Sequence, residues 1–239
     1  MTPRLDIREY GDSGLLVDVA HDDHESRWAT AQGIRAVLED LRPPGLVDIV
    51  ATFDSVFLAF DPLVTDHAAL GLVVETIGPE VVSTVAVASP RVFRVPTLYG
   101  GDAGPDLDEV ASDLGMTAQE LVDRHTSTTW RIRFRASPVG APFMDGPTWP
   151  RPIPRLSEPR TRVSPGSVAL SGQQCVIYPV ASPGGWRLIG VTPSILVDPS
   201  GDVPVVHVPG DSLRFVSVGP AEFARLSEQP EELMVDTSA

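Results

Sequence analysis

The chain has 239 residues, of which 42% are hydrophobic and 21% charged, as expected for a globular protein with one large domain or two small ones. Its net charge of −14 argues against nucleic acid as a partner, because nucleic-acid binding needs a basic face. The sequence has no apolar run near the ~18 residues of a membrane span, no apolar signal core at its start and one cysteine. We therefore expect a cytoplasmic protein without a membrane segment or an internal disulfide.

Residues 1–90 predict a small α/β unit. Apolar spacing indicates a strand over 15–19, a helix over 22–41, strands over 47–53 and 56–60, and a helix over 66–77. Asp22 is the expected N-cap of the first helix, with Glu25 three residues on, and Pro43-Pro44-Gly45 is expected to end it. Followed by a strand over 92–96, this order resembles a ferredoxin-like split unit.

Residues 91–239 predict a second domain in which two helices precede a set of short strands. The helices are expected over 105–114, ending at Gly115, and from the capping box of Thr117 and Glu120 to near His125. Short strands with Pro and Gly corners then indicate a closed β-barrel; they are expected over 131–134, 167–170, 175–178, 186–189, 195–197 and 213–218. A short helix over 221–226 and a frayed acidic tail end the chain. The predicted fold class is α+β.

The basic residues are unusual in kind, since all 18 are arginine and none is lysine. The lack of lysine excludes a Walker-type nucleotide loop. It also excludes a Schiff base, an attached biotin, and the serine–lysine relay of the amidase-signature enzymes. Codon bias is the simplest explanation, and the chemical exclusions hold under it as well.

A segment rich in arginine and proline is a candidate anion site. Seven of the 18 arginines lie within residues 131–162, and eight prolines lie within residues 138–165. Guanidinium groups held by proline corners suit a carboxylate or a phosphate. Alternatively, Arg131, Arg133 and Arg135 alternate along one strand and point to solvent. Arg155 and Arg160 each follow a proline, and they either serve a site or pair with Asp or Glu.

Other candidate residues lie near helix ends. His125 ends a helix, where the helix dipole favours the imidazolium form, and it is either a site residue or a structural hydrogen-bonding group. Asp102 and Asp106 flank a helix start and are expected to cap it; alternatively, the turn at 99–101 lies in a cleft between the domains. Cys175 is expected to be a small buried residue. The other four histidines have no partners at ligand spacing, so no metal site is predicted.

The segment Gly184-Gly185-Trp186 is the strongest single candidate for the wall of a binding site. Paired glycines permit a close backbone approach to a ligand or a partner chain. Trp186 offers either a stacking face or a core anchor. Tyr178, a few residues earlier, can donate a hydrogen bond to a carbonyl.

Several motifs occur in the order in which a known protein family has them. They include Gly11-Asp12-Ser13-Gly14, Tyr99-Gly100-Gly101-Asp102-Ala103-Gly104-Pro105-Asp106-Leu107, His125-Thr126-Ser127, Pro159-Arg160-Thr161-Arg162-Val163-Ser164-Pro165-Gly166 and Ser182-Pro183-Gly184-Gly185-Trp186. Together they resemble the family that contains allophanate hydrolase subunit 1, the B subunit of 5-oxoprolinase and the sporulation kinase inhibitor KipI. The resemblance covers nearly the whole chain.

The resemblance implies a cyclophilin-like barrel over residues 91–239. It also implies the B subunit of an ATP-dependent 5-oxoprolinase, a hydrolase complex that opens a cyclic amide to glutamate, with this chain inactive alone. The implied partners in the hetero-oligomer are a homologue of subunit 2, which corresponds to the C subunit, and a homologue of the A subunit. ATP would act through the complex because this chain has no nucleotide motif. The alternatives are allophanate hydrolase subunit 1 or a carboxyltransferase component of urea metabolism, and a non-catalytic inhibitor of a sensor kinase.

The family pattern also implies site residues. We expect catalytic roles for His125, Arg155, Arg160 and Tyr178. We expect substrate contacts from Tyr99, Gly101, Gly140, Gly184, Gly185 and Trp186.

The chain departs from the family pattern in one loop and at one strand end. The loop over 136–146 keeps Gly140 but has Ser137 and Ala141 where the family has phenylalanine, and Val191 replaces an arginine. These changes favour an altered substrate or an altered partner.

Overall fold

The computed structural model describes residues 3–84, 90–136, 139–198, 200 and 204–236; for residues 79–84 it describes the backbone alone. Contacts between Cα atoms divide the chain into two compact units, Met1–Ala88 and Ser89–Ala239, next to the boundary expected after residue 90. Ser137, at one of the departures from the family pattern, lies outside the described residues. Within the described ranges, no helix is long and apolar enough to cross a membrane.

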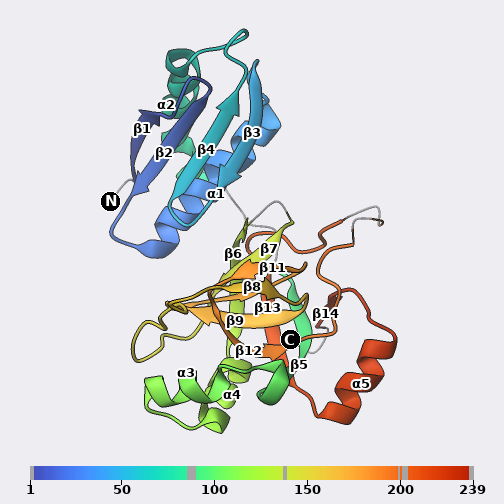
Figure 1. The fold of residues 1–239 in the computed structure, drawn as a ribbon. Helices are drawn as coiled ribbons and strands as arrows, with labels where there is room; N and C mark the ends of the chain where they lie inside the picture. Colours follow the sequence, from blue (N-terminus) through green and yellow to red (C-terminus); the bar gives the residue numbers. More distant parts are fainter. Residues whose placement is uncertain (1–2, 85–89, 137–138, 199, 201–203, 237–239) are drawn as a thin grey trace. The chain divides into compact units, whose positions relative to one another are not determined.

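The first unit is a four-stranded antiparallel sheet with two helices (Figure 1). Its strands pair in the order β1-β2-β4-β3. The elements are β1 (Arg4–Glu9), β2 (Gly14–Ala20), α1 (His24–Leu41), β3 (Leu46–Ala51), β4 (Ser55–Phe60) and α2 (His67–Thr84). Alternate residues of β2 and β4, such as Val17 and Leu58, share one face of the sheet and pack with Ile34 of α1 and Leu70 of α2.

Helix α1 begins two residues later than the predicted range, with its N-cap one residue later, and ends where predicted. Asp23 is the N-cap, and its carboxylate accepts a 2.8 Å hydrogen bond from the Ser26 N–H, so the prediction of Asp22 is wrong. Arg42 closes the helix in the left-handed conformation, with φ 45°. Pro43 then prevents a further helical turn.

The sheet has a ferredoxin-like strand order, but one edge strand comes from a different part of the chain. The strand beside β2 is β1, which precedes it, whereas residues 92–96 were expected there. Strand β1 was not predicted because Leu5 and Ile7 are its only apolar residues, and they stand between charged ones. Both pack against the core of this unit.

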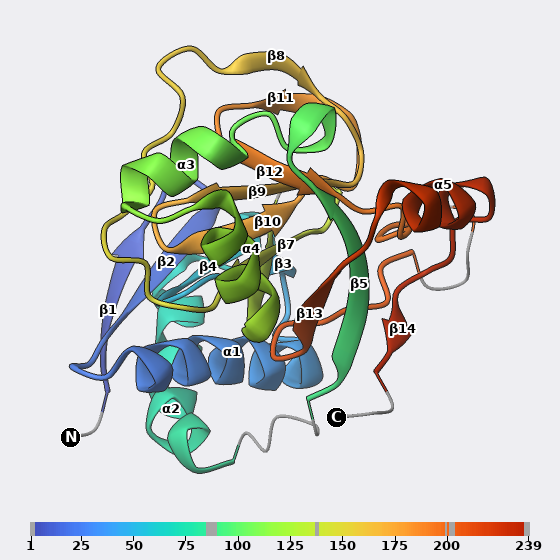
Figure 2. The ribbon, with the colours of Figure 1, turned by 90° about the horizontal axis from the view of Figure 1, so that it is seen from below.

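The second unit is a closed barrel of seven strands, as predicted (Figures 1 and 2). Neighbouring strands pair in the order β12-β9-β10-β7-β6-β13-β5, and β5 pairs with β12 to close the circle. The barrel strands are β5 (Val92–Tyr99), β6 (Thr129–Ala136), β7 (Ala141–Asp145), β9 (Ser167–Ser171), β10 (Gln174–Ile177), β12 (Arg187–Val191) and β13 (Ser212–Ser217).

Three short strands lie outside this circle. Strand β8 (Arg160–Val163) pairs with β11 (Ser182–Gly184), and β14 (Met234–Val235) pairs with β5. The prediction of a frayed tail is therefore wrong for β14. The expected strand over 195–197 is reduced to an isolated bridge at Ile195.

Helices follow β5 and β13 in this unit. The turn η1 (Gly101–Ala103) and the helices α3 (Leu107–Leu114) and α4 (Ala118–Ser127) come between β5 and β6, and α5 (Pro220–Glu228) follows β13. Gly115 ends α3 with φ 73°, and Thr117 and Glu120 form the capping box that opens α4, so both predictions are confirmed.

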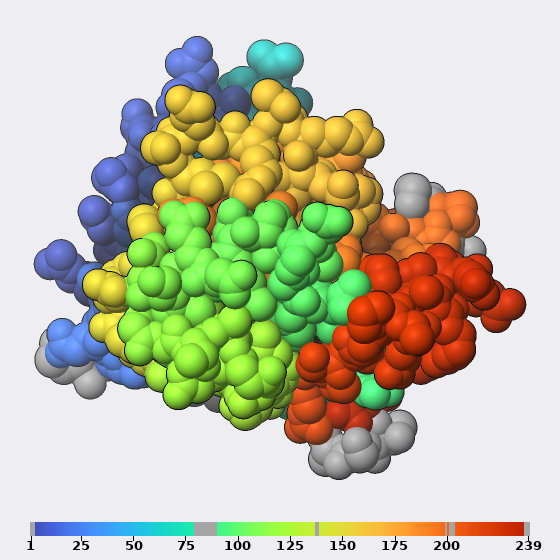
Figure 3. All heavy atoms as spheres, turned by 60° about the horizontal axis from the view of Figure 1, so that its bottom comes forward, coloured from blue at the N-terminus to red at the C-terminus, as the bar shows by residue number. Residues whose placement is uncertain are grey.

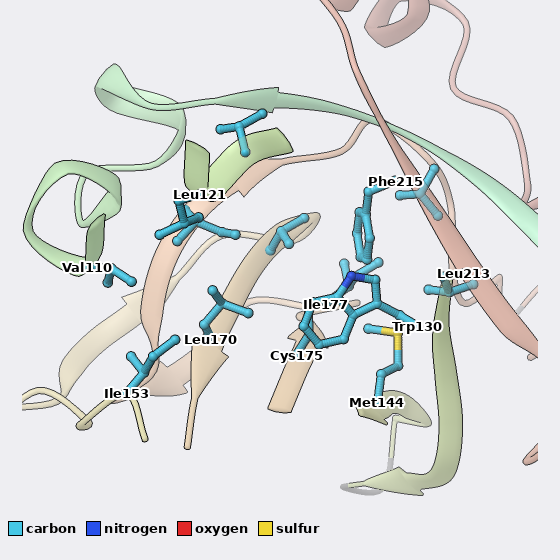
Figure 4. Packing of buried hydrophobic residues seen from close by; sticks show 14 of the residues in the cluster. Val110, Leu121, Trp130, Met144, Ile153, Leu170, Cys175, Ile177, Leu213 and Phe215 are labelled. Atoms are coloured by element: carbon cyan, nitrogen blue, oxygen red, sulfur yellow. The ribbon is translucent and has the colours of Figure 1, made fainter. Parts of the chain in front are cut away.

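The interior of the barrel is filled by apolar and aromatic side chains. Trp130, Met144, Cys175 and Phe215 come from four different strands and point toward one another (Figure 4). Each is at most 1% exposed. Cys175 is thus the small buried residue that its place in the sequence predicted.

Candidate functional site

The barrel wall has a second buried layer on its outer face. Leu170, Cys175 and Ile177 belong to the interior core, whereas Ala169 and Val176, which alternate with them along β9 and β10, belong to a separate apolar cluster. Because successive residues of a strand point to opposite faces, this separate cluster lies outside the barrel.

The two-stranded sheet of β8 and β11 contributes to this outer layer. Val163 of β8 and Trp186, just after β11, are both buried in the outer cluster, at 1% and 6% exposure. Proline corners before and within the two strands limit their backbone freedom. We call Arg155, Arg160, Tyr178, Gly184 and Trp186, which these segments bring together, the outer-face cluster.

Trp186 is the aromatic centre of the outer-face cluster. Its ring meets Phe143 edge to face, with 5.0 Å between ring centroids. The guanidinium of Arg155, an exposed residue, stands 5.7 Å from the centroid of the indole ring. Trp186 is therefore the packing anchor that was one of its two predicted roles, and its role as a stacking face for a ligand stays a prediction.

Tyr178 and Gly184 are in close contact within the cluster. A Cβ on Gly184 would lie 2.3 Å from the Tyr178 hydroxyl, so only glycine fits there without displacing the ring. At Gly185, an added Cβ would make an ordinary van der Waals contact with Pro159 at 3.5 Å. The close approach expected of the paired glycines is thus made by Gly184, and it is made to Tyr178.

The phenol of Tyr178 is a neutral hydrogen-bonding group. Partial burial raises its pKa, while a hydrogen bond from the Trp186 N–H and the positive charges of Arg155 and Arg160 oppose that shift. The phenol oxygen is thus an acceptor for the backbone of Trp186. Its proton stays on the hydroxyl at neutral pH and can be donated.

Arg160 is held by a buried carboxylate. Its Nη2 donates to Asp106 Oδ1 at 2.7 Å, and Asp106 Oδ2 accepts the Leu188 N–H at 2.7 Å. Asp106 is 5% exposed and stands at the N-cap position of α3, but its side chain makes no capping hydrogen bond. The prediction that Asp106 caps the helix is therefore wrong, because the carboxylate is used to bind β12 and Arg160.

This ion pair joins two segments far apart in the sequence. The space-filling view shows the proline-rich segment in yellow against the green segment that contains η1 and α3 (Figure 3). Arg160 and Asp106 belong to these two segments. Arg160 Nη1 is covered by protein and has no hydrogen-bond partner among the described residues.

His125 and Tyr99 lie together inside the barrel, away from the outer-face cluster. The Tyr99 hydroxyl is 2.8 Å from His125 Nδ1, and Cys175 Sγ is 3.6 Å from His125 Nε2. His125 has no solvent exposure. The polar groups of His125 and Tyr99 are thus engaged with each other. The catalytic role of His125 and the substrate contact of Tyr99 stay predictions.

Burial keeps this interior group uncharged. It lowers the pKa of His125 to about 3, so the imidazolium form expected from the helix end is wrong at neutral pH. It raises the pKa of the Cys175 thiol and places the pKa of Tyr99 well above its usual value. Together the three residues form a hydrogen-bonded, neutral polar group within an aromatic core.

The remaining predicted glycines, Gly101 and Gly140, lie at turns of the chain. Gly101 is exposed in η1 with φ 52°, and a Cβ there would meet open space. Gly140 turns the chain before β7 with φ 70°, and its carbonyl is 3.1 Å from His207 Nε2. Neither arrangement tests the substrate contact that the family pattern implies.

The alternating arginines of β6 do not all face solvent. A bulge between Ile132 and Phe134 shifts the register, and Arg133 becomes 5% exposed. Its Nε donates to both carboxylate oxygens of Asp145 at 2.7 Å. The prediction of a solvent-facing row is therefore wrong for Arg133, which is held in a neutralising pair.

Sequence reasoning missed two contributors to the outer-face cluster. Phe143 was not singled out, although its place in a short apolar stretch before Gly146 is a usable signal. Asp106 was considered only for the helix and for a cleft, because nothing local indicates a partner 54 residues away.

A surface pocket of about 260 Å³ lies between β5, β14 and α5, and its lining includes Arg94, Glu222, Arg225 and Met234. Over the described ranges, no three His, Cys, Asp or Glu residues are grouped to hold a metal ion.

Residues 5–207 match the family model of the carboxyltransferase domain, subdomain C and D. The chain is 29% identical over 238 residues to the 5-oxoprolinase B subunit of Bacillus subtilis (strain 168), covering 96% of this chain and 99% of that protein. It is 41% identical over 126 residues to the 5-oxoprolinase B subunit of Escherichia coli O157:H7, covering 53% of this chain and 58% of that one.

Two solved structures share the fold. The crystal structure of TTHA0988 matches with TM-score 0.71 and 30% identity over 87% of this chain, which spans 40% of that longer chain. The Kluyveromyces lactis urea carboxylase matches with TM-score 0.76 over 98% of this chain and 24% of its own, at 18% identity. At that identity the likeness shows the fold alone.

Proposed function

The chain belongs to the carboxyltransferase domain family, subdomains C and D, and on that premise we propose that it is the B subunit of an ATP-dependent 5-oxoprolinase complex. The complex hydrolyses the C–N bond of a cyclic amide and converts 5-oxoproline to glutamate. A homologue of the C subunit, or subunit 2, binds this chain, and a homologue of the A subunit completes the enzyme. ATP acts through the complex.

The observation that carries this proposal is the match to the 5-oxoprolinase B subunit of Bacillus subtilis along 99% of that protein. The geometry fits a protein that is inactive alone. The imidazole of His125 and the thiol of Cys175 are both enclosed in the barrel, whereas the outer-face cluster presents hydrogen-bond donors. A binding surface of this kind needs a nucleophile or an activated water from another chain.

Reconstitution tests the proposal. The chain is co-expressed with a subunit 2 homologue, and size-exclusion chromatography should give one peak larger than either chain alone. Adding ATP and the homologue of the A subunit should then release glutamate from 5-oxoproline. Omitting this chain, or omitting ATP, should abolish that release.

Two results would contradict the proposal. The first is two separate chromatographic peaks at micromolar concentration. The second is a stable complex of all three subunits that releases no glutamate. Binding of this chain to the dimerisation domain of a sensor kinase, without any turnover, would favour the inhibitor alternative.

A further inference from the structure

Two hydrogen-bond donors of the outer-face cluster, Arg155 and the Tyr178 hydroxyl, lie beside Trp186. Arg155 holds its guanidinium over Trp186 at 5.7 Å, where the exposed residue can be reached from solvent. Tyr178 receives the Trp186 N–H on its oxygen and keeps its proton for another partner. Both arginines are close enough to the phenol to act on it electrostatically.

An unsatisfied nitrogen adds an independent indication. Arg160 Nη1 is covered by protein, and no described residue accepts a hydrogen bond from it. A buried polar group without a partner is costly, and native structures satisfy such groups with water, an ion or a ligand. Because Nη1 is covered, an acceptor from outside the chain reaches it only when the Arg160 side chain moves.

The charge balance selects the class of ligand. Asp106 neutralises Arg160 through the 2.7 Å pair, so the cluster carries the one positive charge of Arg155. One charge matches a carboxylate and falls short of a phosphate, which carries up to about two negative charges at neutral pH. The half-buried phenol ring of Tyr178, beside the donors, suits a small ligand with apolar ring carbons.

We propose that the outer-face cluster binds the carboxylate of a small monocarboxylic substrate, with Arg155 and the Tyr178 hydroxyl as the direct donors and Arg160 beside them. This inference rests on the proposed function, under which the ligand is 5-oxoproline and its carboxylate lies outside the ring that is opened. The cluster thus orients the substrate, and the reacting amide faces the partner chain.

The test is a binding measurement that needs no turnover. The purified chain, labelled with nitrogen-15, is titrated with 5-oxoproline while the Nε–Hε signals of Arg155 and Arg160 are followed by NMR. Arg155→Lys identifies the Arg155 signal. 5-Oxoproline should move both signals, and 2-pyrrolidinone, the same cyclic amide without a carboxylate, should leave them in place.

Variants then assign the donors. Arg155→Ala should weaken 5-oxoproline binding about 10- to 100-fold, the loss expected for a charge-assisted hydrogen bond. Tyr178→Phe, which keeps the ring, should weaken it about 3- to 10-fold. Arg225→Ala removes an exposed guanidinium from α5 and should leave binding unchanged.

The outcomes separate this inference from the proposed function. Unmoved arginine signals, equal binding of 2-pyrrolidinone, or tighter binding of inorganic phosphate would overturn the carboxylate site. Unchanged binding by Arg155→Ala would overturn it as well. If the reconstituted complex releases glutamate while the signals stay unmoved, the function stands and the site is wrong. If 5-oxoproline binds but no glutamate is formed, the site stands and the function is wrong.

Discussion

Polar side chains lie against aromatic rings both inside and outside the barrel wall, but the two groups differ in burial and in hydrogen bonding. Inside, Tyr99, His125 and Cys175 lie against Trp130 and Phe215, and their polar atoms are engaged with one another. Outside, Tyr178, Arg155 and Arg160 lie around Trp186 with donors left over. The difference teaches that residue type alone does not show whether a polar group is satisfied within the protein, because burial and mutual hydrogen bonding decide that.

The largest effect should come from Arg160, which links the outer face to a buried carboxylate. Arg160→Ala leaves Asp106 buried without its counter-charge and should lower the free energy of unfolding by about 3–5 kcal/mol. Arg155→Ala, at an exposed stacked position, should lower it by less than about 1 kcal/mol. Chemical denaturation of both variants measures the contrast.

Equal losses for the two arginines would contradict this division of roles. A small loss in Arg160→Ala would mean that the pair with Asp106 is not structural. A large loss in Arg155→Ala would mean that its stacking on Trp186 anchors the fold.

Lowering the pH should destabilise the folded protein, because His125 is buried in its neutral form. The folded pKa of His125 is about 3, below its unfolded value of about 6.5, so the unfolded chain takes up a proton first as the pH falls. Stability is therefore complete above pH ~6.5 and is lost toward pH ~3. Between pH 7 and 5, wild type should lose about 2 kcal/mol more than His125→Gln, which has no proton to gain.

The control for this prediction is His24→Gln, at an exposed position, which should lose as much as wild type over the same range. His207 is also buried, and its pKa is lowered to about 4, so it contributes a slope of its own to every variant. The difference between wild type and His125→Gln isolates His125. Parallel curves would show that His125 can be protonated in the folded chain.

The two adjacent glycines offer a sharper comparison within the outer face. Gly184→Ala forces a Cβ against the Tyr178 hydroxyl and should cost about 1–3 kcal/mol of stability. Gly185→Ala meets Pro159 at ordinary distance and should change stability by less than about 1 kcal/mol. Thermal melts of both variants decide this.

Activity gives these glycine variants a second readout. Gly185→Ala should still lower glutamate release by the complex if its backbone faces a ligand or the partner chain. Full activity would make this segment a structural corner. Equal melting temperatures for the two variants would show that the Tyr178 ring can move aside.

A smaller effect should come from the interior thiol. Cys175→Ala removes one buried atom and should lower the free energy of unfolding by about 1 kcal/mol. In the folded chain, the thiol should react with a soluble thiol reagent only as fast as the barrel opens. Rapid labelling without denaturant would place Cys175 within reach of solvent and weaken the contrast between the two faces.

The sequence by itself determined the family, the closed barrel and most helix ends. These depend on local patterns: the capping box of Thr117 and Glu120, the glycine stop at Gly115 and short apolar runs between corners. Strand β1 was not predicted, because an alternation of only two apolar residues is too short to indicate a strand.

Only the tertiary structure decided which polar side chains are satisfied by hydrogen bonds within the protein. Alternation along a strand shows which residues share a face, but not whether that face is the inside of a closed barrel. His125 is buried because α4 packs on β13 and places the imidazole against Trp130 and Phe215, and Arg133 is buried because a bulge shifted its strand. Asp106 became the partner of Arg160 because folding brings together segments that no local pattern connects.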